Sequence, residues 1–306
     1  MSTRERRPFP LVPRRRLTGL PFGDLPGRRR GHGSDVIGHR EYEPGDPVMT
    51  IDWFATARAS AARGDDEFVV RDHAADEAPR VAIVVDRRPA MSLYPEGLPW
   101  LDKRDAVREA VGAIVVSALA ARADLGALDF AGGEEWWLPP GRRDRARLVL
   151  EREDEASFDA PSDSVERGLA FLARHRRDLP AGSFVFVLSD FLEPPAADAW
   201  RGAVARGLDV VPVVIQDPVW ERSFPDVGGV AVPVAEPDGA RVGVVRLSRG
   251  AAARRRREHE ERHARLETAF AAAGVRAVAL STSEPQEVDR AFHEWAEERR
   301  RSRSAR

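Results

Sequence analysis

The chain has 306 residues, and its 48 basic and 50 acidic side chains leave a formal net charge of −2. This balance argues against nucleic-acid binding by the molecule as a whole, while 42% hydrophobic residues are enough for a sizeable core. The absence of cysteine excludes disulfides, thiolate catalysis and cysteine-based metal sites. No run approaches the ~20 apolar residues of a membrane span, and the N-terminus lacks the apolar stretch of a signal peptide, so a cytoplasmic location is expected.

Residues 1–30 are predicted to form a basic, flexible arm. They hold nine arginines and only two acidic residues, with no sustained hydrophobic period. Such an arm can contact phosphate groups, and nucleic-acid binding through it is one alternative function. A solvated tail is the simpler interpretation.

Residues 31–79 form a second segment, which is expected to pack on the main domain because it has too few large apolar residues for a core of its own. The run Pro-Gly-Asp at 44–46 indicates a turn, and residues 67–73 alternate enough to be an exposed strand. Trp53 and Phe54 are predicted to plug the core and tie this segment to the sheet.

From residue 80 to residue 306, apolar strand patterns alternate with amphipathic helix patterns. This alternation predicts an α/β fold, with a doubly wound, mostly parallel sheet and helices on both faces. The strands are predicted at 81–86, 127–131, 183–188, 210–215 and 275–280, and the helices at 101–123, 142–153, 165–176, 195–206, 250–273 and 286–300.

Two hairpins are predicted to interrupt this alternation. Residues 134–138 are expected to return along a sheet edge, with one ring of Trp136-Trp137 inward and the other exposed. A second hairpin, formed by 230–234 and 242–247, is expected within an insertion near residues 218–248.

The buried strand at 81–86 ends in Asp86, and the strand at 183–188 ends in Ser-Asp at 189–190. Ligands of open α/β sheets gather beyond the carboxyl ends of such strands. The loops 86–92, 162–164 and 189–193 are therefore predicted to contact a protein partner, through Asp86, Arg88, Ser92, Ser162, Asp163, Ser164 and Asp190.

Several short motifs resemble those of the domain-of-unknown-function-58 family. They are Arg-Glu-Tyr-Glu-Pro-Gly-Asp at 40–46, Ile-Asp-Trp at 51–53 and Leu-Ser-Asp-Phe-Leu at 188–192. The first two, together with the Ala-Arg that follows at 57–58, contribute the motif residues Tyr42, Pro44, Gly45, Asp46, Asp52, Trp53 and Arg58, of which Asp52 and Arg58 are expected to form an ion pair. The resemblance implies a domain similar to the von Willebrand factor type A fold. It also implies a cytoplasmic or membrane-attached interaction module, commonly paired with a MoxR-type AAA+ ATPase, that assists the assembly or activation of other proteins, and such a module is expected to be non-enzymatic.

The resemblance also implies a magnesium site, held in type A domains by an Asp-x-Ser-x-Ser loop and residues of two other loops. Asp86 and Asp190 are in place, but Arg88 and Ala90 stand at the serine positions. A guanidinium has no lone pair for a metal and repels it, so the site is expected to be degenerate and the protein to need no cofactor. Arg88 is predicted to replace the metal charge beside both aspartates and to pair with a partner carboxylate. Which residue of the 162–164 loop takes the third position stays open.

Two enzymatic alternatives remain. Asp86, Asp163 and Asp190 are candidates for a metal-dependent hydrolase, and His259-Glu260-Glu261-Arg262-His263 fits the His-Glu-x-x-His pattern of zinc proteases. That pattern lies in a stretch rich in Arg and Glu, where such matches arise easily, and a charged helix face is the simpler interpretation. No phosphate-binding loop is present, and Lys103 lies at a helix start without glycines, so no enzymatic activity is expected.

Overall fold

The computed structural model describes residues 6–14, 36–43, 46, 48–63, 68–73, 78–92, 100–142, 144–235 and 242–304. The chain divides into two compact units. The sheet unit comprises Met1–Arg14 and Arg80–Arg306, and the small unit comprises Arg15–Pro79. The predicted packing of residues 31–79 on the main domain stays a prediction.

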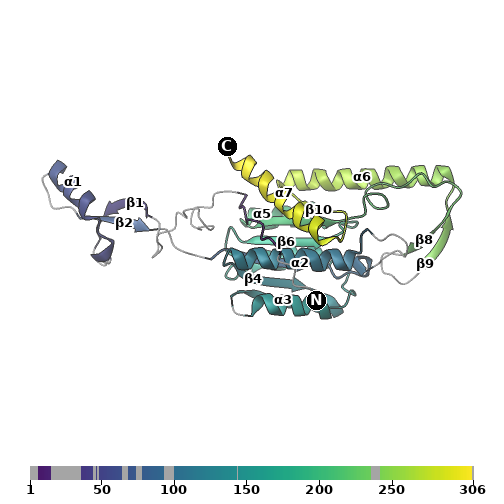
Figure 1. The fold of residues 1–306 in the computed structure, drawn as a ribbon, viewed down its shortest axis with the longest axis horizontal. Coiled ribbons are helices and arrows are strands. Elements are labelled where there is room, and N and C mark those ends of the chain that lie inside the picture. The colour runs from purple at the N-terminus through teal and green to yellow at the C-terminus, as the bar shows by residue number, and fades with distance from the viewer. Residues whose placement is uncertain are drawn as a thin grey trace. The chain divides into compact units, whose positions relative to one another are not determined.

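Six strands form the central sheet in the order β10-β7-β6-β3-β4-β5 (Figure 1). All neighbours are parallel except β5, which runs antiparallel to β4. The strands are β3 (Arg80–Val85), β4 (Asp124–Asp129), β5 (Trp136–Gly141), β6 (Phe184–Ser189), β7 (Asp209–Ile215) and β10 (Val278–Leu280). The strand order reverses between β3 and β6, as in doubly wound sheets, so these two strands flank the topological switch point. The predicted fold class is confirmed.

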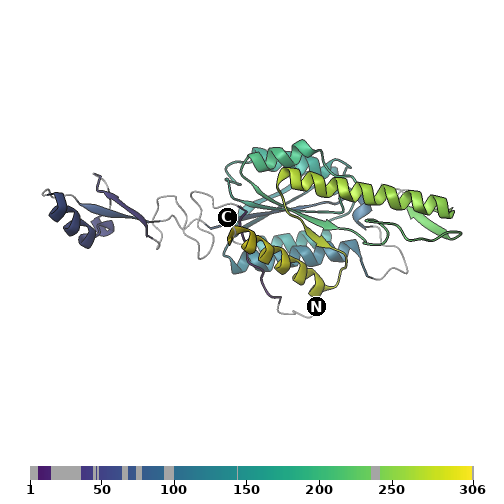
Figure 2. The same ribbon diagram turned by 90° about the horizontal axis from the view of Figure 1, so that it is seen from above.

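Helices cover both faces of this sheet (Figure 2). One face carries α2 (Lys103–Ala120), α3 (Arg145–Glu155) and α7 (Pro285–Ser304), and the other carries α4 (Ser164–Arg174), α5 (Ala197–Ala205) and α6 (Arg249–Ala273). Every residue of β6 is buried, which explains why this strand reads as an unbroken apolar run. The short 3-10 turns η2 (Pro89–Ser92) and η3 (Ala131–Gly133) follow β3 and β4.

The predicted helices all occur, and a side chain caps the N-terminus of two of them, α2 and α6. The Asp102 side chain accepts a hydrogen bond from the Asp105 amide at the start of α2, and Ser248 caps α6 in the same way through the Ala251 amide. Gly274 ends α6 in the left-handed conformation, with φ 62°. Of the helices in the described residues, none is both long and apolar enough to cross a membrane.

Both predicted hairpins are present. β5 closes the sheet edge, where Trp137 packs edge-to-face on Phe171. Trp136 is not freely exposed as expected, because the Arg152 guanidinium lies over its ring, 5.0 Å from the centroid. The second hairpin pairs β8 (Ala231–Ala235) with β9 (Val242–Arg246) in a separate two-stranded sheet.

The start of the chain departs from the predicted flexible arm. Residues 6–14, here called the N-terminal strap, lie on the α2/α7 side of the sheet unit. Phe9 is 3% exposed and stacks on Phe292 with 4.7 Å between ring centroids. The Phe9 amide donates to Ser117 Oγ at 3.0 Å, so backbone and side chain are both anchored.

The strap also engages two of the arginines that suggested nucleic-acid binding. Arg6 pairs with Glu109 and with Asp289, and the Arg14 amide donates to Asp209 Oδ2 at 2.7 Å. Two of the nine arginines of the arm thus bind the protein itself. Residues 1–5 and 15–30 of the predicted arm lie outside the described residues.

The small unit pairs β1 (Val36–Glu41) with β2 (Val69–His73) and adds η1 (Val48–Thr50) and α1 (Trp53–Arg63). Asp52 organises it: Oδ1 accepts the Phe54 and Ala55 amides at 3.1 and 3.0 Å and thereby caps α1. Oδ2 lies 3.0 Å from Arg71 Nε, so the ion partner of Asp52 is Arg71 and not the predicted Arg58. The pKa of Asp52 is held below its ordinary value, first by Arg71.

The other family motif residues have structural contacts as well. Arg40 and Asp46 form a bidentate pair at 2.6 and 2.5 Å, and Tyr42 packs edge-to-face on Phe68. Pro44 and Gly45 lie outside the described residues.

The two aromatic residues predicted as a core plug add nothing to the core of the small unit. Trp53 is 59% exposed and Phe54 is 82% exposed. Their predicted contact with the sheet stays a prediction.

Candidate functional site

The two aspartates of the predicted site meet at the switch point of the sheet. Asp86 follows β3 and Asp190 follows β6, and these neighbouring strands are in register, with Val85 opposite Leu188. The Asp86 amide donates to Leu188 O at 2.9 Å, which continues the pairing by one residue. Both aspartates are completely buried. Two buried carboxylates side by side require compensating positive charge.

Arg88 supplies the first positive charge, at the position predicted from the sequence. Its Nε lies 3.0 and 2.9 Å from the two Asp86 carboxylate oxygens, and its Nη2 lies 2.6 Å from Oδ2. The same Nη2 is 3.3 Å from Asp190 Oδ1, and Nη1 is 3.5 Å from Glu193 Oε2. The guanidinium therefore bridges both aspartates.

Lys103 supplies the second positive charge, and the sequence interpretation missed it. Its Nζ lies 2.8 Å from Asp190 Oδ2 and 2.5 Å from Glu221 Oε1, and the side chain is buried at the start of α2. Lys103 is the only lysine among 48 basic residues, and this exception in the sequence could have indicated that the residue has a special position. An ammonium makes a compact point charge that fits between two carboxylates.

These contacts shift the pKa values in a consistent direction. Burial alone raises the pKa of Asp190, but Lys103, Arg88 and hydrogen bonds together hold that pKa below its ordinary value. Burial lowers the pKa of Lys103, yet Asp190 and Glu221 raise it well above its ordinary value. Burial likewise opposes the charge on Arg88, and Asp86 leads the contacts that raise its pKa. Lys103, Arg88 and Asp190 therefore stay ionised at neutral pH.

The residues present do not fit a magnesium ion. Hard oxygen ligands must converge on Mg²⁺, whereas here a guanidinium and an ammonium lie within 3.3 Å of the carboxylates. Ser189 Oγ donates to Asp86 Oδ2 at 2.7 Å, so this hydroxyl is engaged as well. Among the described residues, no three His, Cys, Asp or Glu side chains gather in a way that could hold a metal.

Arg87 fixes the neighbouring loop. Its guanidinium forms a buried bidentate pair with Glu153, at 3.0 and 2.7 Å, and lies over the Phe158 ring. The Arg87 carbonyl accepts the Ala160 amide at 3.0 Å. The two consecutive arginines therefore stabilise different parts of the site. Arg88 compensates the negative charge of the aspartates, and Arg87 anchors the chain that leads into the 162–164 loop.

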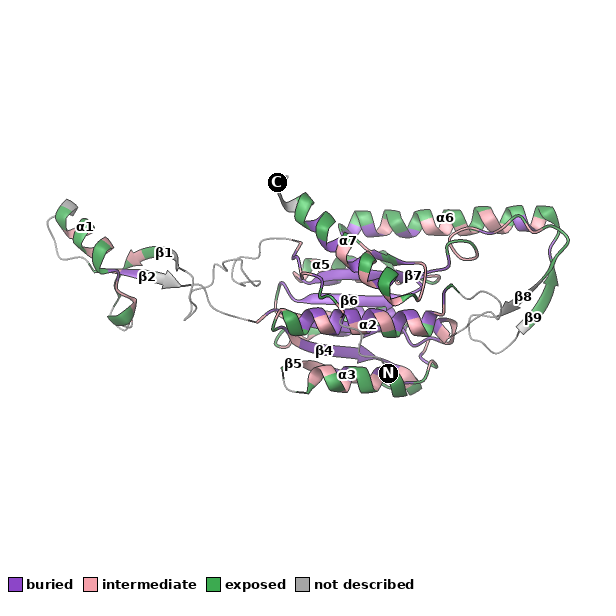
Figure 3. Cartoon of the chain, viewed as in Figure 1, coloured by how far each residue is buried: buried purple, intermediate pink, exposed green. Residues whose placement is uncertain are grey.

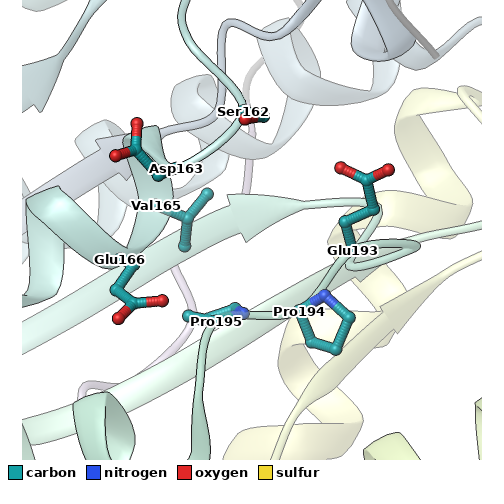
Figure 4. Close-up of a pocket in the computed structure, with 7 residues that line it drawn as sticks. All are labelled: Ser162, Asp163, Val165, Glu166, Glu193, Pro194 and Pro195. Atoms are coloured by element: carbon teal, nitrogen blue, oxygen red, sulfur yellow. The ribbon is translucent and has the colours of Figure 1, made fainter.

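The 162–164 loop and the loop after β6 enclose a pocket of about 180 Å³ (Figure 4). Three carboxylates line it, together with small apolar and hydroxyl groups, and the lining residues are Ser162, Asp163, Val165, Glu166, Glu193, Pro194 and Pro195. Glu193 ends the predicted contact loop 189–193, whereas Glu166 lies outside the predicted loops. The rim of this pocket is the accessible part of the site.

The predicted partner-binding residues therefore separate into two groups. Ser162 and Asp163 are exposed, whereas Asp86, Asp190 and Ser164 are buried and are not available to a partner. The Ser92 hydroxyl donates to the Pro89 carbonyl within its own turn. The sequence placed Asp86 and Asp190 at the ends of neighbouring strands but could not tell the buried residues of the candidate site from the exposed ones.

The two histidines of the zinc-protease pattern lie on α6 and have other contacts. His259 Nδ1 is 2.8 Å from the Ser223 carbonyl, and His263 Nε2 is 3.4 Å from Glu267. Burial lowers the pKa of His259. No third metal ligand accompanies them in the described part of the chain, so the geometry gives the zinc interpretation no support.

Similar solved structures include an aerotolerance-related membrane protein from Bacteroides fragilis, which is 14% identical to this chain. The match covers 72% of this chain and 99% of the Bacteroides fragilis chain, with a TM-score of 0.43. The conserved hypothetical protein BatB from Bacteroides thetaiotaomicron has 16% identity, the same coverage and the same TM-score of 0.43. Uncharacterized proteins of Mycobacterium bovis and Mycobacterium tuberculosis are 29% identical over 231 residues, which is 75% of this chain and 69% of theirs.

The family comparison covers most of both units. Residues 38–267 match the family described as "Protein of unknown function DUF58", from the small unit through most of α6. This match spans well over half of the chain and contains both the Tyr42–Trp53 motifs and the paired aspartates. The chain therefore belongs to the DUF58 family.

Proposed function

We propose that this protein is a non-enzymatic interaction module that binds a protein partner through the loops at the carboxyl end of its sheet, without a metal ion. The buried charge cluster carries this proposal. Arg88 lies between Asp86 and Asp190, where a metal-dependent site requires an ion, and Lys103 pairs with the other carboxylate oxygen of Asp190.

The contact surface of the proposed module is the rim of the pocket, because the charged centre is closed. Arg88 is 5% exposed and its donors already face Asp86, Asp190 and Glu193, so the earlier idea that it meets a partner carboxylate is set aside. The rim residues Asp163 and Glu166 are exposed and acidic. The buried ion pairs keep these loops in place, so the rim is ordered before binding and less conformational entropy is lost.

A MoxR-type AAA+ ATPase is the proposed partner, with client proteins as further partners, and a cytoplasmic location is part of the same proposal. Family resemblance motivates this identification. The charge cluster itself supports only a metal-independent contact with protein.

The test is capture of partners from native lysate with the full-length protein, with and without EDTA, followed by mass spectrometry. We expect the same partners in both samples, and no heat of binding when Mg²⁺ or Mn²⁺ is titrated at millimolar concentration. A saturable metal titration, or loss of all partners in EDTA, would contradict the proposal.

A pair of variants tests the contact surface. The double variant Asp163→Ala, Glu193→Ala should lose the captured partner, because it removes two carboxylates of the pocket. Asp198→Ala, an exposed acidic residue at the start of α5, is the control and should retain it. Equal capture by both variants would exclude the rim as the contact surface.

A further inference from the structure

The β8/β9 hairpin is a second surface, distinct from the pocket. Val244 is 73% exposed and Val245 is 39% exposed. Successive residues of a strand point to opposite faces, so both faces of β9 are exposed at these two positions (Figure 3). The base is anchored, because Leu247 is buried with Phe224 and Ala252 at the start of α6. Two-stranded hairpins are marginally stable alone, so a further strand would stabilise this one.

The pairing register determines which backbone groups face outward. The Leu247 amide donates to the Val230 carbonyl at 3.0 Å, which marks that pair as hydrogen-bonded. Hydrogen-bonded and non-bonded pairs alternate in an antiparallel ladder, so Pro233 opposite Val244, and Ala231 opposite Arg246, are non-bonded pairs. The N–H and C=O groups of Val244 and Arg246 therefore point to the outer edge of β9.

The two outer edges of the hairpin therefore differ in their capacity to pair with another strand. Pro233 is at the centre of the outer edge of β8, where a proline offers no N–H to another strand. β9 contains no proline, and in the described residues no strand pairs with its outer edge. Proline is a common means of blocking an edge, and here only one edge is blocked.

The surroundings of the open edge are basic. Residues 240–257 contain seven arginines and no acidic residue. Arg246, Arg249, Arg254 and Arg257 are exposed, and of these only Arg254 has a carboxylate of the described residues within 4.0 Å, that of Glu258. Arg246 is the last residue of β9 and Arg249 is the first residue of α6, so an acidic partner would meet these two guanidinium groups near the strand edge.

We propose that the outer edge of β9 binds an acidic, extended segment of a protein partner as a third strand. Main-chain hydrogen bonds to Val244 and Arg246 would hold the segment, the exposed valines would form cross-strand pairs, and the arginines would select carboxylates. The chemistry favours a peptide over nucleic acid or a lipid surface. Among the described exposed residues of β9 and of the first half of α6, none is aromatic, so nothing there stacks on bases or anchors at a lipid interface.

The experiment uses the full-length protein and a fluorescent peptide of about ten alternating valine and glutamate residues, a typical strand length. Fluorescence anisotropy should show binding that weakens with salt, and the same peptide with lysine in place of glutamate should not bind. Val244→Pro removes an outward N–H and should weaken binding about tenfold or more. Ala231→Pro removes the equivalent N–H on the β8 edge and is the matched control, which should bind as the unmodified protein does.

The charge requirement is tested separately. The double variant Arg246→Glu, Arg249→Glu should lose peptide binding and its salt dependence, with an unchanged circular dichroism spectrum. Equal effects of the two proline variants would overturn strand addition at β9. Failure to bind the peptide would also overturn the proposal, as would binding of phosphatidylserine vesicles or duplex DNA in place of the peptide.

Discussion

Arg88 and Lys103 compensate the buried Asp190 from different elements, and Arg88 compensates Asp86 as well. Arg88 is in the loop that follows β3, and Lys103 is the first residue of α2. Each cation also has an acidic contact nearer the surface, Glu193 for Arg88 and Glu221 for Lys103. Removing one cation leaves a buried carboxylate that the remaining cation compensates only in part.

We predict that Lys103→Met lowers the free energy of unfolding by about 3–5 kcal/mol, the usual cost of breaking a buried ion pair from one side. Urea denaturation followed by circular dichroism measures this change. Arg147→Met is the control, since Arg147 pairs with Glu151 on the exposed surface and its loss should leave the midpoint almost unchanged. Similar midpoints for Lys103→Met and the unmodified protein would show that the cluster contributes nothing to stability.

The pKa of Asp190 predicts a pH dependence. Because its folded-state pKa lies below the ordinary value, the carboxylate stabilises the fold above the unfolded pKa of about 3.9. That contribution is lost as pH falls below about 3.9 and through the folded-state pKa. The free energy of unfolding should be measured from pH 7 down to about 2.5, and it should decrease as the pH drops below about 3.9. In the Lys103→Met variant this decrease should be smaller. If the free energy of unfolding depends on pH in the same way in both proteins, Lys103 does not influence the pKa of Asp190.

The N-terminal strap shows how an element without regular secondary structure becomes part of a core. Phe9 packs against Phe292 and Trp295 of α7 and against Phe186 of β6. Arg299 Nη1 donates to the Val12 carbonyl at 3.0 Å and fixes the other half of the strap. The strap thus packs against α2, α7 and β6 and is part of the core.

We predict that Phe9→Ala lowers the free energy of unfolding by about 3–5 kcal/mol, as for other buried phenylalanines. Urea denaturation provides the measurement. Phe54→Ala, which truncates an exposed phenylalanine, is the matched control and should leave stability almost unchanged. If both variants unfold at the same urea concentration as the unmodified protein, the strap does not belong to the folded core.

At the scale of the whole molecule, the chain has two compact units, and the proposed binding surfaces lie on one of them. The sheet unit carries the charge cluster, the pocket and the β8/β9 hairpin. In the small unit the polar motif residues are engaged internally, Asp52 with Arg71 and Asp46 with Arg40, while Trp53 and Phe54 are not part of its core.

We predict that residues 31–79 pack on the sheet unit, because their large apolar residues are too few for an independent core. Limited trypsin digestion followed by mass spectrometry should then leave the chain between Arg58 and Arg80 uncut. Cleavage in that range at low protease concentration, with release of two separately folded fragments, would refute the prediction. Cleavage within residues 15–30 is compatible with it.

The local sequence determined the architecture of the sheet unit. Buried parallel strands are unbroken apolar runs, and helices repeat every 3.6 residues, so both leave a signal in adjacent residues. The same signals placed Asp86 and Asp190 at strand ends, and the non-coordinating Arg88 predicted a site without metal. The short motifs around Tyr42 and Trp53 pointed to the family.

Only the tertiary structure decided which groups share the site and which are accessible. Lys103 and Asp190 are separated by 87 positions in the chain, and no periodic pattern connects them. The strap was mistaken for a flexible arm because its arginines dominate the composition, while Phe9 becomes part of the core only when α7 is in place. Charge compensation and burial act through space over a few ångströms, and sequence spacing does not report that distance.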